Sequence, residues 1–160
     1  MDFLKRYVPH GMTVFIAIIF LDSLRYKFTN HPNTQEIFGR LNEWSASWGA
    51  DGLFAQSGLF SQYVIGTAEL VASLILLSTM VFKKFRFLQP LGALLGLAIM
   101  TGAISFHLFT PLGIDPNNDG GGLFMAACTV WVFCAALLFI RRAELKDVIG
   151  RLCVFLKPAE

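Results

Sequence analysis

The chain has 160 residues, of which 55% are hydrophobic and only 15% are charged. Soluble domains average about 25% charged residues, so this composition argues against an ordinary soluble domain. The formal net charge of +2 is small and does not indicate a nucleic-acid patch, and we expect no nucleic-acid partner.

The first predicted membrane helix covers residues 8–28, with an apolar core at residues 12–21. A basic start followed by a short apolar region would also suit a cleaved signal peptide. No cleavage site of small residues follows, and Asp22 and Arg25 continue the same helical phase. We therefore expect a retained transmembrane helix.

Residues 33–48 predict an amphipathic helix inside the long first loop. Asn33 and Glu36 have the spacing of a capping box, and Gly49 is a natural stop. Five apolar side chains then share one helical face; they are Ile37, Phe38, Leu41, Trp44 and Trp48. We expect this helix to lie over the outer ends of a helix bundle or on the membrane surface.

Three further membrane helices are predicted at residues 60–82, 87–110 and 121–141. About 20 apolar residues span a hydrocarbon core of roughly 30 Å. The predicted fold is therefore an all-α membrane protein of one domain. It is a bundle of four transmembrane helices with an amphipathic outer-side helix in the first loop, and it ends in a tail at residues 142–160.

The basic residues predict the orientation of the bundle, because Lys and Arg concentrate in cytoplasmic loops. With both termini inside, the outer side holds Arg25, Lys27 and Arg40. The inner segments hold the other ten of the 13 basic residues, which are Lys5, Arg6, Lys83, Lys84, Arg86, Arg141, Arg142, Lys146, Arg151 and Lys157. We expect a multi-pass protein of the bacterial inner membrane with both termini in the cytoplasm.

A polar pocket is expected in the outer half of the bundle. Charges inside a membrane are costly, and they normally face the bundle interior and pair with one another. The helix directions bring six side chains to this half, which are Asp22, Arg25, Tyr26, Lys27, Glu69 and His107. Arg25 is the expected partner of Glu69. Two alternatives are a pair that only locks the helices together and a protonated Glu69 bonded to a backbone carbonyl.

The polar loop before the last span has two interpretations. Asp115, Asn117 and Asp119 match the first half of a calcium-binding loop, but its twelfth position is Ala126 instead of Glu. Asp, Asn and Gly are also what simple turns use, and Asp119 could cap the helix that follows.

Other cofactor sites find less support. A haem with two axial histidines in one leaflet would need His31 and His107, and His31 lies in a loop beside Pro32. A metal site of the same histidines with Glu69 is chemically permissible, although spacing alone does not support it. The chain has no C-x-x-C motif, which argues against a thiol oxidoreductase, and we expect its three cysteines to be unpaired.

Four segments together resemble the DoxX-like family of bacterial membrane proteins. They are LRYKFTNHPNTQEIFGRL after the first span, GTAELVASLILL, GALLGLAIMTGAISFHLFTPLGI and NDGGGLFMAA. The resemblance covers about residues 12–142 and implies a four-helix membrane bundle. The family takes its name from a subunit of a thiosulfate:quinone oxidoreductase. The implied motif positions are Lys27, Phe28, Glu69, His107, Asp119 and Gly120. This chain departs from the family in having Asp22-Ser-Leu-Arg25 where small residues are usual.

Three functions from different classes are compatible with these patterns. The first is an accessory protein of redox metabolism, or a subunit of a quinone-linked oxidoreductase, that binds a quinone-like molecule or a lipid headgroup in the pocket. The second is a structural or assembly subunit with a partner membrane subunit. The third is a small proton-coupled transporter with Glu69 as its proton site, completed by a homo-oligomer. An autonomous enzyme is not expected, because no nucleophile and base have a recognisable spacing.

Overall fold

The computed structural model describes the backbone of residues 2–155 and the side chains of residues 7–150. Within that range the protein is all-helical. Its elements are α1 (Asp2–Phe28), α2 (Pro32–Ala46), α3 (Gln62–Val81), the 3₁₀ helix η1 (Lys83–Leu88), α4 (Gln89–Phe109), α5 (Gly122–Ile140) and α6 (Arg142–Phe155). Four of these segments are long and apolar enough to cross a membrane, as the sequence predicts; they are Tyr7–Phe28, Gln62–Val81, Lys83–Phe109 and Gly122–Ile140.

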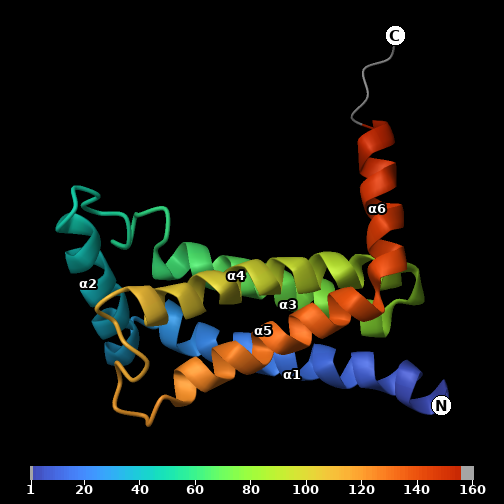
Figure 1. The fold of residues 1–160 in the computed structure, drawn as a ribbon, viewed down its shortest axis with the longest axis horizontal. Coiled ribbons are helices and arrows are strands. Elements are labelled where there is room, and N and C mark those ends of the chain that lie inside the picture. Colours follow the sequence, from blue (N-terminus) through green and yellow to red (C-terminus); the bar gives the residue numbers. More distant parts are fainter. Residues whose placement is uncertain (1, 156–160) are drawn as a thin grey trace.

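The four long helices run lengthwise side by side. Of the two shorter helices, α2 lies across one end and α6 projects crosswise from the other (Figure 1). α1 packs against α3 and α5, while α4 packs against α3 and α5 from the other side. α2 crosses one end of the bundle. α6 and the N-terminus lie at the opposite end.

The centre of the bundle is closely packed around small residues of α4. A Cβ atom on Gly92 would lie 2.9 Å from Cγ of Leu76 in α3, and one on Gly96 would lie 2.9 Å from Sγ of Cys134 in α5. Small residues let membrane helices approach closely, because lipid tails supply no hydrophobic force between the helices. Cys134 is a free thiol, as is Cys128; the side chain of Cys153 lies outside the described residues.

The start of α2 corrects the predicted capping box. The N-cap is His31, whose Nδ1 accepts a hydrogen bond from the backbone N–H of Asn33 at 3.2 Å. Asn33 therefore lies within the first turn instead of capping it. Pro32 explains the shift, because proline suits the first helical position, where its missing N–H costs nothing.

α2 covers the end of the bundle, which is one of the two predicted placements. Leu41 is buried in a small core with Phe54 and Leu112, and Ile37, Phe38 and Trp44 pack against it. Trp48 lies beyond the end of the helix and is exposed. The predicted tail is mostly the helix α6, and its residues 156–160 lie outside the described part of the chain.

Candidate ligand pocket beneath α2

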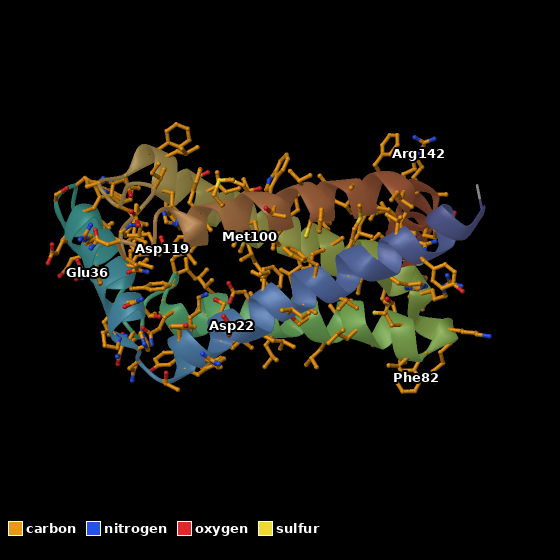
Figure 2. The ribbon with its side chains drawn as sticks, turned by 90° about the horizontal axis from the view of Figure 1, so that it is seen from below. Asp22, Glu36, Phe82, Met100, Asp119 and Arg142 are labelled. Carbon is orange, nitrogen blue, oxygen red and sulfur yellow. The ribbon has the colours of Figure 1, made fainter. Side chains whose placement is uncertain are left out.

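A cavity of about 560 Å³ lies beneath α2, among α1, α3, α4 and α5. Most of its wall is apolar and includes Phe20, Ile99 and Phe106. The polar residues of the wall include Asp22, Ser23, Tyr26, Lys27, Glu69, His107, Asn117 and Asp119. Figure 2 shows Asp22 and Asp119 toward the end of the bundle that α2 crosses. Ligand pockets typically combine such an apolar wall with a few convergent polar groups.

An ion pair between α1 and α3 is the most buried charged feature of this cavity. Nζ of Lys27 lies 2.9 Å from Oε2 and 3.0 Å from Oε1 of Glu69. The exposed fraction is 14% for the lysine side chain and 3% for the glutamate side chain. Nζ also donates to Oγ of Ser23, one turn earlier on α1. Glu69 is thus held in apolar surroundings by a single ammonium group.

Arg25, the expected partner of Glu69, does not fill that role. Its side chain is 73% exposed, and its Nε lies 3.7 Å from Oδ1 of Asp22 on the same helix. Two residues along a helix correspond to a rotation of about 200°. Lys27 therefore faces α3, while Arg25 points almost the opposite way and is absent from the described residues that line the cavity.

The glycine at position 66 helps to seat the lysine. A Cβ atom there would lie 3.4 Å from Cδ of Lys27 and 3.4 Å from Cζ of Phe28. The lysine stem therefore lies directly against the backbone of α3, and its ammonium group reaches Glu69, three residues further along that helix.

Asp22 and Tyr26 also line the cavity. The side chain of Asp22 is 57% exposed, so it lies where the cavity meets the exterior. The ring of Tyr26 packs edge-on against the ring of His31, with 4.7 Å between the centroids. Asp22 and Tyr26 form the rim of the pocket, whereas Lys27 and Glu69 lie deeper.

His107 lines the cavity from α4 and is anchored by the loop that follows. Its Nδ1 lies 2.6 Å from the carbonyl oxygen of Gly113. A carbonyl can only accept, so Nδ1 carries the hydrogen, and Nε2 of the neutral ring is left as an acceptor. Gly113 has a φ of +71°, a backbone conformation that residues with a side chain rarely adopt. His107 and Glu69 therefore share the cavity wall but are held by different partners.

The Asp115–Asp119 loop is a turn that caps α5. Oδ1 of Asp119 accepts from the N–H groups of Gly121 and Gly122, and Oδ2 accepts from that of Leu123. Partial desolvation alone would raise the pKa of Asp119, but these hydrogen bonds outweigh it and lower the pKa below its ordinary value. Oδ1 of Asp115 accepts from the N–H of Asp119 at 2.8 Å. Both carboxylate oxygens of Asp119 and Oδ1 of Asp115 are therefore engaged with backbone N–H groups of this turn and of the start of α5.

The described residues contain no group of three or more His, Cys, Asp and Glu that could hold a metal ion. His31, His107 and Glu69, which chemistry alone would permit as ligands, do not form such a group. His31 caps α2, His107 is bonded to Gly113, and Glu69 is bonded to Lys27.

Gln62 is a structural residue of the site that the sequence patterns did not indicate. Its Nε2 donates to the carbonyl of Lys27 at 2.7 Å and to Oδ1 of Asn30 at 2.6 Å. Its Oε1 accepts from Nε2 of Gln35 on α2 at 2.6 Å. Gln62 thus ties the end of α1, the start of α3 and α2 together beside the pocket. The only feature of the sequence that could have indicated this role is the position of Gln62 at the start of an apolar span.

Comparison of the chain with protein-family models, with curated proteins and with solved structures finds no match. The pocket therefore provides the main structural indication of function.

Proposed function

We propose that the chain is a multi-pass inner-membrane protein of the DoxX-like type that binds a quinone-like molecule or a lipid headgroup, as an accessory protein of redox metabolism. The observation that carries this proposal is the Lys27–Glu69 pair in the wall of an otherwise mostly apolar cavity. The cavity volume of about 560 Å³ lies within the range that small-molecule sites use.

The donors and acceptors of the pocket suit a ligand with an apolar body and an oxygen-bearing head. The ammonium group of Lys27 can turn from Ser23 toward a ligand carbonyl while it keeps Glu69 as its counter-ion. Nε2 of His107 can accept a hydrogen bond from a ligand hydroxyl. A ligand that carries both groups would be held between α1 and α4. The apolar wall would enclose its body and exclude water.

The charge distribution supports the proposed location. Of the 13 basic residues, Arg25, Lys27 and Arg40 lie toward the end that α2 crosses. Nine others belong to segments at the opposite end, and Lys157 lies outside the described residues. By the preference of Lys and Arg for the cytoplasm, the pocket opens toward the outer face and both termini are cytoplasmic. The ligand then enters from the outer leaflet or from the space outside the membrane.

A structural or assembly subunit is the second candidate. One observation favours it, because Lys27 already has Glu69 and Ser23 as partners without any ligand. Buried ion pairs can serve helix packing without any chemistry. In that case the cavity is a by-product of packing beneath α2.

Native mass spectrometry with lipid and quinone extraction separates the two candidates. The samples are the purified wild type, Glu69→Gln and the control Glu36→Gln, which removes an exposed glutamate paired with Arg40 on α2. The proposal predicts a co-purified quinone or lipid in the wild type and the control, and its loss in Glu69→Gln. An empty wild type, or equal retention in all three, would favour the structural candidate. Should Glu69→Gln fail to fold, His107→Leu tests the same pocket with the ion pair intact.

A further inference from the structure

The end of the bundle opposite the pocket carries the helix α6, which has no role in the function proposed above. It lies crosswise to the four long helices (Figure 1) and contacts α4, α5 and η1. Because the long helices cross the membrane, a helix at right angles to them lies along the membrane surface. α6 thus has the position of an interfacial helix.

The sequence of α6 has the pattern of such a helix. Its apolar residues recur at Leu145, Val148, Ile149 and Leu152, the spacing of one helical face. Val148 is buried against the bundle, while Ile149 remains 48% exposed. The α6 helix therefore uses part of its apolar face to pack on the protein and leaves part of it free for lipid.

Basic residues of two segments gather beside this face. Lys83, Lys84 and Arg86 of η1 are exposed, as are Arg142 and Lys146 of α6, and η1 contacts α6. Of the two acids on α6, Glu144 is already bonded to Arg141, with 3.1 Å between Oε1 and Nη1. The five exposed cations are therefore only partly balanced by carboxylates.

Exposed apolar residues flank these cations. Phe82 and Phe87, on either side of the basic run in η1, are about half exposed. The guanidinium of Arg142 lies over the ring of Phe139, 4.8 Å from its centroid. Rings beside cations suit the headgroup level of a bilayer, where one end of a side chain meets acyl chains and the other meets phosphate.

We propose that η1 and α6 together form a binding site for the headgroup phosphate of an anionic phospholipid. Several N–H donors of lysine and arginine converge where the phosphate lies, and Ile149, Phe82 and Phe87 contact its acyl chains. The negative surface charge of the membrane adds to the attraction. This site is independent of the pocket beneath α2 and of the function proposed for it.

The test measures which lipids stay bound to the protein. The protein is equilibrated in mixed micelles with equal amounts of phosphatidylglycerol and phosphatidylcholine, and the lipids retained after partial delipidation are counted by native mass spectrometry. The variants are Lys84→Gln/Lys146→Gln and, as a control at the opposite end, Arg25→Gln/Arg40→Gln. Each neutralised cation near a phosphate should cost roughly fivefold in affinity. The ratio of retained phosphatidylglycerol to phosphatidylcholine should therefore fall about 20-fold in the first variant and stay unchanged in the control.

Two results would overturn the proposal. One is an unchanged lipid ratio in Lys84→Gln/Lys146→Gln, and the other is an equal fall in the control. Should the first variant fail to assemble, a salt titration of the wild type replaces it. Preference for phosphatidylglycerol that persists from low salt to about 1 M salt, where charges are screened within about 3 Å, would contradict a phosphate site. Glu69→Gln should keep the preference, which separates this site from the pocket.

Discussion

Lys27 and Glu69 show how a membrane helix can carry a charge at a mostly apolar position. Each charge alone would be costly in the hydrocarbon region. Together they form two short contacts, and Ser23 engages the ammonium group further. The pair offsets the loss of water only while both partners are present, because a single buried charge has nothing to replace its hydration.

The dependence of each charge on the other predicts that a single variant is less stable than the double variant. Lys27→Met leaves a carboxylate that is 3% exposed without its cation, and we expect it to cost about 3–5 kcal/mol of unfolding free energy. Lys27→Met/Glu69→Leu removes both charges and should recover most of that loss. SDS-induced unfolding of the delipidated protein in mixed micelles measures the unfolding free energy of both variants.

The exposed pair of Arg40 and Glu36 on α2 is the matched comparison. Its single and double variants should change stability by less than about 1 kcal/mol. The loss of stability in Lys27→Met/Glu69→Leu could instead equal the sum of the losses in Lys27→Met and Glu69→Leu. That result would show that Lys27 and Glu69 are not coupled.

At the level of single elements, α4 depends on two glycines to reach its neighbours. Gly92 and Gly96 lie where a Cβ atom would come within 2.9 Å of Leu76 or Cys134. Gly102 lies on the same helix with no such neighbour within 4 Å. The same substitution should therefore act in opposite directions along one helix.

We expect Gly92→Ala to destabilise the bundle by about 1–3 kcal/mol, because Cγ of Leu76 is close to its own backbone and cannot simply swing away. Gly102→Ala should be neutral or stabilising by up to about 1 kcal/mol, because alanine is the better helix former. Thermal unfolding in detergent compares them. Equal melting temperatures for the two variants would mean that the close approach of α3 and α4 is not essential.

The start of α5 depends on Asp119, whose carboxylate accepts three backbone N–H groups. Its pKa lies below the ordinary value of 3.8, so the folded state favours the ionised form. The stabilisation is fully present above the ordinary value. It is lost as the pH falls through the lowered pKa, because protonation then removes the charge that these hydrogen bonds prefer.

At neutral pH, Asp119→Ala should therefore lower stability by about 1 kcal/mol, and the difference from wild type should shrink as the pH is lowered below 3.8. Melting temperatures between pH 7 and pH 2.5 test this. Asp51→Ala, at an exposed position in the loop after α2, controls for the loss of a carboxylate. A gap between wild type and Asp119→Ala that stays constant with pH would argue against the charged cap.

At the scale of the whole molecule, the bundle has two different ends. One is closed by α2 above the candidate ligand pocket, and the other carries α6, η1 and most of the basic residues. The proposed orientation follows from that asymmetry, since Lys and Arg are retained on the cytoplasmic side.

Cysteine labelling can test the orientation. In a chain whose native cysteines are replaced by serine, Ser57→Cys lies in the loop after α2 and Lys84→Cys lies in η1, both at exposed positions. A membrane-impermeant maleimide added to spheroplasts should label Ser57→Cys at once and Lys84→Cys only after the membrane is opened. The reverse pattern would place the pocket on the cytoplasmic side.

Much of this architecture could be predicted from the sequence. Span length and hydropathy determine the four membrane helices, because a stretch of about 20 apolar residues has few stable alternatives in a bilayer. The amphipathic period of α2 followed from its sequence, and the outer-half position of Asp22, Tyr26, Lys27, Glu69 and His107 followed from helix direction and depth. Helix phase also grouped Arg25 with Asp22 and Tyr26 in the pocket, and that assignment was wrong. The cap of α2 was misassigned because a histidine side chain took the place usually held by Ser, Thr, Asp or Asn.

The partner of Glu69 was decided only by the tertiary structure. Arg25 and Lys27 are both basic and lie at similar depth, so hydropathy and spacing do not distinguish them. The choice depends on how α1 is rotated about its axis relative to α3, and that rotation is set by the packing of Gly66 against the lysine stem and by the hydrogen bonds of Gln62 to the end of α1. Such contacts join residues more than 30 positions apart, and local sequence patterns carry no record of them.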